Sequence, residues 1–182
     1  MNATATATAT ATLTEDCTLY AQPYNIDATG FYFTSAEEFE QKAEGLTDRY
    51  GCPVEEFEIQ YIDGDDAALF EAVGVDQSNL DTWFELLDLE DHEKAALYFL
   101  CGVCGRGLSE ALGIVQDVSL YEGRLIEAAT ELFDECYAHE IPENLRQYID
   151  YDRFARDCDI GGDMTEFEFN GTTYTCTNAA CL

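Results

Sequence analysis

Two cysteines in the middle of the chain have the spacing of a reactive or metal-binding motif. Cys101 and Cys104 form C-x-x-C, which occurs in zinc sites and in redox-active thiol pairs. A zinc site needs a second pair of ligands, yet no further C-x-x-C or H-x-x-H motif follows at zinc-finger spacing. The motif also lies at the end of an expected helix and not between a strand and a helix. Structural thiols are therefore expected here, with zinc or redox chemistry as the alternatives, and no metal ligand is assigned.

An acidic segment and two histidines could support other chemistry. The segment Asp63-Gly64-Asp65-Asp66 looks like the start of a calcium-binding EF-hand loop, but the fifth, sixth and twelfth places lack the required acid, glycine and glutamate. We interpret it as a turn. His92 and His139 are the only histidines, and the chain has neither a G-x-S-x-G nor a G-x-x-x-x-G-K motif. We therefore expect no catalytic residue, no cofactor and no enzyme activity.

The net charge is the most informative property of the chain. It has 38 Asp and Glu against 8 Lys and Arg, for a formal net charge of -30. Self-repulsion of this size opposes a compact state. Duplex DNA carries one negative charge per roughly 1.7 Å of its axis, so this charge matches about 50 Å of duplex, or about 15 base pairs. A protein with a DNA-binding groove is the complementary partner, whereas nucleic acid itself would be repelled.

The carboxylates are spread along ordered-looking segments instead of forming an acidic tail. No Lys or Arg occurs between Arg49 and Lys94, where 14 carboxylates lie. Four more follow Arg124 on the side of a helix opposite its apolar stripe. Like charges four residues apart cost a helix a few tenths of a kcal/mol each, so selection for stability alone would interleave lysines. The acidic surface is expected to comprise Glu55, Glu56, Glu58, Asp63, Asp65, Asp66, Glu71, Asp76, Asp81, Glu85, Asp88, Glu90, Asp91, Glu93, Glu127, Glu131, Asp134 and Glu135.

Two other interpretations of the charge stay open. Adaptation to high salt also favours acid over lysine, and it predicts poor folding at low salt without competition with DNA. An acidic chaperone for basic nucleic-acid-binding proteins would bind many such proteins without preference.

The periodicity of the apolar residues predicts an α+β fold, arranged as an elongated chain of two to three small domains. Residues 1–14, with five Ala-Thr repeats, predict a disordered tail. Residues 15–63 predict an N-terminal α+β domain of two strands, a helix and a third strand. Residues 64–118 predict a central helical domain. Residues 119–182 predict a C-terminal α+β domain of two helices and a hairpin.

Several boundaries follow from single residues. Pro23 interrupts the first strand, Thr18 to Ile26, and therefore predicts an edge strand. Ser35 begins a helix that Gly51 and Pro53 are expected to end.

The segment from Pro142 to Cys158 predicts one continuous helix that is nearly neutral. Its three arginines each have an aspartate four residues away, in the pairs Arg146–Asp150, Asp152–Arg156 and Arg153–Asp157. A neutral helix in so acidic a chain indicates a packing or subunit contact. The contact residues are expected to be Leu145, Tyr148, Ile149, Tyr151 and Arg153.

The chain has no run of 18 apolar residues, and Met1 to Thr12 lacks the features of a signal peptide. We therefore expect a cytoplasmic protein without membrane contact. Its eight cysteines are then expected to be free, buried thiols, although their even number is also compatible with disulfides.

The near-neutral segment carries a family resemblance. Residues 141–151, IPENLRQYIDY, followed by Ala155-Arg156-Asp157, resemble the C-terminal signature I-P-x-x-L-x-x-Y-I-D-Y of the ArdA antirestriction family. Leu19-Tyr20, Glu55 to Glu58, Trp83-Phe84-Glu85 and the closing hairpin come in the family's order, so the resemblance covers about residues 17–177.

The resemblance implies an antirestriction protein encoded on mobile genetic elements of bacteria. It implies an elongated, curved homodimer whose carboxylates imitate bent DNA and occupy the DNA groove in the methyltransferase core of type I restriction-modification enzymes. Family dimerisation lies toward the C-terminal half, in agreement with the near-neutral segment. Whether modification is blocked as well as restriction stays open. The Ala-Thr tail and the eight cysteines depart from the family pattern.

Overall fold

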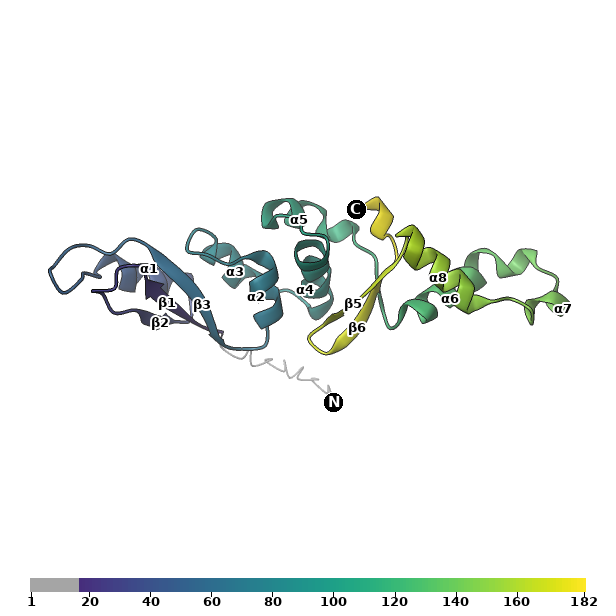
Figure 1. The fold of residues 1–182 in the computed structure, drawn as a ribbon, viewed down its shortest axis with the longest axis horizontal. Helices are drawn as coiled ribbons and strands as arrows, with labels where there is room; N and C mark the ends of the chain where they lie inside the picture. The colour runs from purple at the N-terminus through teal and green to yellow at the C-terminus, as the bar shows by residue number, and fades with distance from the viewer. Residues whose placement is uncertain (1–16) are drawn as a thin grey trace, which may run out of the picture.

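The computed structural model describes residues 17–182, so the expected Ala-Thr tail lies outside the described residues. The elements follow one another along an elongated body, with the N-terminal sheet at one end and α7 (Glu143–Arg146) at the other (Figure 1). Helices and two antiparallel sheets of three strands each make up this part of the chain. The predicted α+β class is therefore confirmed.

The elements have the following bounds. The strands are β1 (Thr18–Pro23), β2 (Phe31–Phe33), β3 (Phe57–Asp63), β4 (Leu120–Glu122), β5 (Thr165–Phe169) and β6 (Thr172–Cys176). The other helices are α1 (Ala36–Glu44), α2 (Ala67–Val73), α3 (Leu80–Leu86), α4 (Asp91–Tyr98), α5 (Leu108–Ile114), α6 (Leu125–Cys136) and α8 (Tyr151–Gly161). A π-helical turn, η1 (Phe99–Val103), continues α4.

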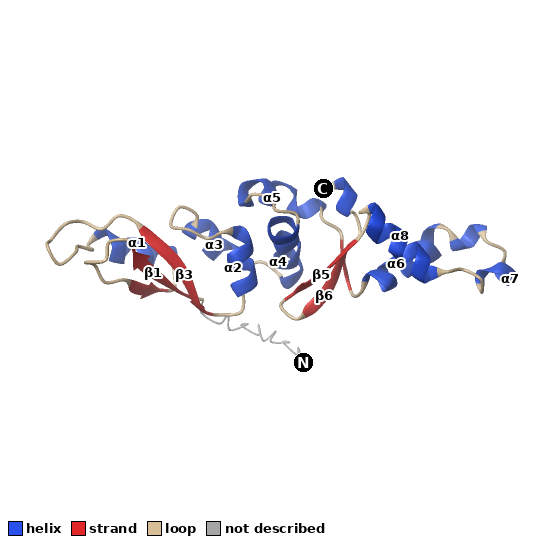
Figure 2. Cartoon of the chain, in the orientation of Figure 1, coloured by secondary structure: helices blue, strands red, loops and turns tan. Residues whose placement is uncertain are grey.

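The N-terminal sheet has the order β2-β1-β3, so β1 is its central strand (Figure 2). The prediction of an edge strand was wrong, because Pro23 ends β1 opposite Phe57 and does not interrupt its ladder. Helix α1 also ends earlier than Gly51. After Gly45 the chain turns back on itself, and the Val54 amide donates to the Leu46 carbonyl at 3.1 Å.

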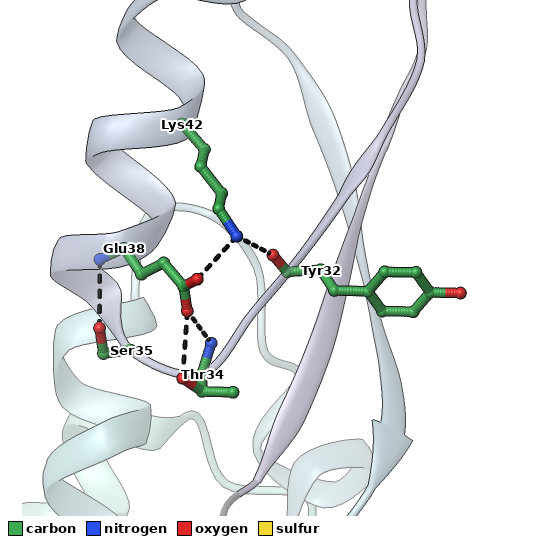
Figure 3. A network of polar contacts seen from close by, with 5 residues as sticks. All are labelled: Tyr32, Thr34, Ser35, Glu38 and Lys42. Atoms are coloured by element: carbon green, nitrogen blue, oxygen red, sulfur yellow. Dashed lines mark hydrogen bonds and ion pairs between the residues drawn. The ribbon is translucent and has the colours of Figure 1, made fainter.

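Helix α1 is fixed at its first turn and covers one face of this sheet. The Ser35 hydroxyl accepts from the Glu38 amide at 3.1 Å, and the Glu38 carboxylate accepts from Lys42 and from the Thr34 amide (Figure 3). The Lys42 ammonium holds the pKa of Glu38 below its usual value. The helix presents Phe39 to the sheet, where its ring centroid lies 5.1 Å from that of Phe33.

Aromatic packing joins the N-terminal sheet to the central helices. Trp83 of α3 is fully buried, and its ring meets those of Tyr61 on β3 and Phe70 on α2 at 6.4 and 5.3 Å between centroids. Burial raises the pKa of Tyr61 to about 12. The apolar core is therefore continuous where the sequence placed a boundary between residues 63 and 64, and that boundary stays a prediction.

The C-terminal sheet has the order β4-β6-β5 and separates two apolar clusters. One face packs on the central helices, where Tyr98 and Phe99 meet Phe169 and Phe167 at 5.0 and 5.1 Å between ring centroids. The expected Asn170-Gly171 turn is confirmed, and both residues have positive φ angles, of 46° and 77°. Strand β4, which the periodicity did not predict, completes the sheet.

The other face of this sheet makes polar contacts with the start of α6 and the residues before it. The buried Thr175 hydroxyl donates to the Gly123 carbonyl at 2.9 Å, and the Glu166 carboxylate accepts from the Leu125 amide at 2.7 Å. Behind these contacts, Ala129 of α6 and Ala155 of α8 belong to the second, smaller cluster.

The expected single helix from Pro142 to Cys158 is two helices, α7 and α8. Helix α7 ends at Arg146, and α8 begins after Asp150. The Asp150 carboxylate caps α8 by accepting from the Arg153 amide at 3.0 Å. Among residues 17–182, none of the three expected arginine–aspartate pairs forms. Arg146 instead donates to the Ile141 carbonyl at 3.2 Å, because the break removes the helical spacing that the pairing with Asp150 requires.

One ion pair lies inside the body. The Lys94 ammonium of α4 lies 2.8 Å from the Asp66 carboxylate at the start of α2, and the two side chains are 11% and 12% exposed. The phenol oxygen of Tyr61 accepts from the Asp66 amide at 2.9 Å. The pair thus anchors α4 to the turn that follows the N-terminal sheet.

We expect Lys94→Met to lower the free energy of unfolding by about 3 kcal/mol or more, because it leaves the Asp66 carboxylate buried without a counter-charge. Lys42→Met, which removes the exposed pair with Glu38, should cost less than about 1 kcal/mol. Urea unfolding followed by the fluorescence of Trp83 measures both. Equal losses for the two variants would contradict a structural role for the buried pair.

Candidate acidic interaction surface

Most of the carboxylates reach the surface of the protein. Residues 17–182 contain 36 Asp and Glu, of which 31 are exposed and only Asp66 is buried. The elements themselves produce this arrangement, since each buries its apolar side and turns its acidic side to solvent. Surface carboxylates therefore extend over the whole body and do not form one cluster.

Helices and strands reach the same result through different periods. In α3, Leu80, Trp83 and Leu86 are buried, while Asp81 and Glu85 between them are exposed, as a period of 3.6 residues requires. In β3 the burial alternates, so Phe57 and Ile59 point inward and Glu58 points outward. The acid thus lies on ordered backbone, which fixes the spacing of its charges.

Helix α6 carries the clearest row of carboxylates. Glu127, Glu131, Asp134 and Glu135 are all exposed, and Ala129 on the opposite side is fully buried. With Ile126 and Thr130 the four carboxylates line a shallow, open hollow along the helix. An i to i+4 step advances about 6 Å along a helix axis, whereas phosphates of one DNA strand follow one another about every 3.4 Å along the duplex axis. The helix therefore presents a regular line of negative charges, with a wider axial spacing than that of phosphates.

The cations do little to neutralise this surface. Lys42, Arg49, Lys94 and Arg106 each pair with a carboxylate of the chain itself. The other four cations are arginines at 124 and beyond. In the half of the body formed by the N-terminal sheet and the central helices, each cation is therefore already paired, and the other carboxylates there have no cation to neutralise them.

Two members of the expected acidic surface are not exposed. Asp66 does not belong to it, because its carboxylate is buried and paired with Lys94. The sequence held one signal for this, since Lys94 is the only cation between Arg49 and Arg106. Glu93 is half-buried, and it accepts from Gln116 at 3.2 Å and from the Glu90 amide at 3.3 Å.

The remaining 16 members are exposed, and some are also held in place. The Asp134 carboxylate accepts from the Tyr151 hydroxyl at 2.6 Å. Hydrogen bonds from Ser78 lower the pKa of Asp76.

Exposed carboxylates outside the expected set widen the surface. The expected set came from the cation-free window and from the row that follows Arg124, so it left out carboxylates on other elements. They include Glu40 and Glu44 on α1, Glu166 and Glu168 on β5, and Asp152, Asp157 and Asp159 on α8.

The end of the body beyond α6 exposes apolar groups. Tyr148 is 77% exposed and Leu145 is 48% exposed, while Ile149 and Tyr151 are half-buried and Arg153 is exposed. What we call the apolar tip consists of Tyr137, Leu145, Tyr148, Ile149 and Tyr151. Neighbouring exposed apolar groups on so acidic a body are typical of a surface that another molecule covers.

The cysteines show no arrangement for chemistry within the described chain. All eight are free, with four buried, as expected, and four exposed. Cys101 is buried, and burial raises the pKa of its thiol, whereas Cys104 is exposed. Residues 17–182 hold no group of three or more His, Cys, Asp or Glu side chains placed to bind a metal ion. Across the same residues, no helix has the length and apolarity to cross a membrane.

Comparison with known proteins places this acidic body in a family. A family model described as antirestriction protein (ArdA) matches residues 11–171. The match includes the N-terminal sheet, the helices α1 to α8 and strands β4 and β5, and it ends at the turn before β6. Neither a curated protein nor a solved structure matches the chain. Because the model covers most of the sequence, the resemblance of the C-terminal signature is confirmed, and the chain belongs to the ArdA family of antirestriction proteins.

Proposed function

We propose that this antirestriction protein imitates duplex DNA and occupies the DNA-binding groove in the methyltransferase core of a type I restriction-modification enzyme. The observation that carries the proposal is the exposure of 31 of 36 carboxylates along an elongated body (Figure 1). A DNA groove holds phosphates with Lys and Arg side chains and gains affinity from released counterions. Carboxylates on ordered elements offer the same charge and the same acceptor oxygens.

Occupancy alone explains the inhibition in this proposal, so the protein needs no catalytic residue. Backbone-like charge carries no base sequence, and enzymes with different recognition sequences should therefore be inhibited alike. Long-range attraction should make association fast and sensitive to salt.

The first test is DNA cleavage by a type I enzyme while the protein and competing DNA are titrated. Inhibition near enzyme stoichiometry that added DNA weakens would support the proposal. A folded protein that inhibits none of several type I enzymes would overturn it and favour adaptation to high salt or a chaperone role.

Distributed charge predicts that single neutralisations have small effects. We expect Glu131→Gln to weaken inhibition by less than about fivefold, as for one exposed ion pair. The triple variant Asp81→Asn, Glu85→Gln, Asp88→Asn should weaken it by about tenfold or more, because its three losses add. These four side chains are exposed and make no hydrogen bond within the described chain, so folding should be preserved. Abolition of inhibition by the single variant would argue against mimicry and for one essential contact.

We further propose that two copies associate through the apolar tip. A dimer would bury Tyr148 and Leu145 and would double the length of charged surface. We expect Tyr148→Asp to convert a dimer into a monomer in sedimentation experiments at micromolar concentration. Ile26→Asp is the matched control, since Ile26 is 95% exposed at the opposite end of the body. A dimer that survives Tyr148→Asp, or dissociates equally with Ile26→Asp, would place the interface elsewhere.

A further inference from the structure

Among residues 17–182, no helix covers the second face of the N-terminal sheet. Helix α1 packs on the side that holds Phe33 and Phe57, and the alternation of β1 turns Tyr20 to the opposite side. Figure 3 shows the Tyr32 ring pointing away from α1 and its Lys42. Tyr32 is 58% exposed. An open sheet face with exposed tyrosine is a surface on which a ligand group can stack.

The strand register places two rings and a carboxylate together on this face. Tyr20 lies between Tyr32 of β2 and Gln60 of β3, and the two tyrosine ring centroids are 4.8 Å apart at an interplanar angle of 54°. The Gln60 amide donates to the Glu58 carboxylate at 3.2 Å, and the register places Glu58 on the same face of the sheet, opposite Gln22. We call Tyr20, Tyr32, Glu58 and Gln60 the aromatic face.

A glycine lets one ring lie against the backbone. A Cβ added at Gly30 would come within 2.6 Å of the Tyr20 hydroxyl oxygen and 2.3 Å of the Ala21 carbonyl oxygen. Any larger residue would therefore displace the Tyr20 ring. The position of this ring is set by packing and does not depend on a ligand.

The chemistry of the aromatic face selects a guanidinium group. Arginine stacks its planar cation on aromatic rings and donates paired hydrogen bonds to carboxylates, which an ammonium group does less well. The chain contains one such arrangement already. The Arg49 guanidinium lies over the Tyr50 ring, 4.9 Å from its centroid, and pairs with Asp27 at 2.7 Å. Strands β1, β2 and β3 contain no Lys or Arg that could occupy the aromatic face from within.

We propose that the aromatic face binds an arginine side chain of the target enzyme, with the guanidinium stacked on the exposed ring of Tyr32 and with Glu58 adding a carboxylate to the same face. The identity of the partner rests on the proposed function, whereas the preference for arginine rests on the site itself. Nucleic-acid bases also stack on tyrosine, but a net charge of -30 repels their phosphates. A DNA-binding groove supplies arginines, and this contact adds to the preference for arginine over lysine that carboxylates already have.

The probes for the test are hexa-arginine and hexa-lysine peptides, titrated into the full chain at equal ionic strength. Because the two peptides carry the same charge, their affinity ratio removes the charge-dependent attraction, and comparison of that ratio with the ratio for Tyr32→Leu removes the preference of the carboxylates for arginine. We expect the wild-type protein to bind the arginine peptide about two- to fivefold more tightly, as for one exposed cation–π contact. Ring resonances of Tyr32, assigned in NMR spectra by their loss in Tyr32→Phe, should shift with the arginine peptide.

Three variants locate the preference. Tyr32→Leu should lower the affinity ratio to the value that the carboxylates alone give, whereas Tyr32→Phe, which keeps the π face, should retain it. Tyr50→Leu is the matched control, because Tyr50 is 70% exposed but its ring already lies under Arg49. Circular dichroism checks that each variant is folded, and the exposure of Tyr32 makes folding of its variants the expected result.

Each other outcome has a defined meaning. An unchanged ratio in Tyr32→Leu overturns the proposal. Shifts of the Tyr32 resonances by oligothymidylate, or loss of self-association in Tyr32→Leu, would overturn it in favour of single-stranded nucleic acid or a second copy of the chain.

The two proposals can fail separately, because the peptide experiment contains no restriction enzyme. Inhibition of cleavage without an arginine preference would leave the proposed function standing and remove the arginine site. A Tyr32-dependent preference without inhibition of any type I enzyme would do the reverse.

Discussion

Repulsion among about thirty uncompensated carboxylates is the constraint on which the rest of this structure depends. Charges that lie within a Debye length of about 8 Å at physiological salt repel one another, and a compact sphere would bring the most of them together. The chain instead spreads its elements along a line (Figure 1) and exposes 31 of the 36 carboxylates in residues 17–182. Burial of apolar surface must therefore stabilise an extended shape.

A line of aromatic contacts meets that requirement. Phe33 and Phe39 form the centre of the N-terminal unit, Trp83 joins it to the central helices, and Phe99 continues the core to Phe167 of the last sheet. Large rings bury much area per residue, so few of them hold a narrow body together. The Asp66–Lys94 pair is a charged contact within this apolar interior. It removes one carboxylate from the surface and holds α4 against the start of α2.

The function proposed for this antirestriction protein uses the same repulsion. Charges that destabilise the free protein become favourable when they meet the cations of a DNA groove, so binding relieves a cost of the fold. The affinity of the protein for the enzyme then depends on the arrangement of many carboxylates and not on one residue. The apolar tip and the aromatic face differ from this background, because apolar and π contacts can specify a copy of the chain or an arginine where charge alone cannot.

The sequence by itself determined the fold class, the order of the elements and the acidic, cation-poor character of the surface. These depend on local period and on composition, so the β-β-α-β start, the helices around Trp83 and the Asn170-Gly171 hairpin could all be predicted.

Only the tertiary structure decided which charges meet and which elements are neighbours. It made β1 the central strand, divided the expected helix at Asp150 and added β4 to the last sheet. It also brought Lys94 to Asp66, which lies 28 residues earlier, and gathered Tyr20, Tyr32 and Glu58 on one open face. Contacts between residues distant in sequence depend on packing of the whole chain, and no local pattern carries that information.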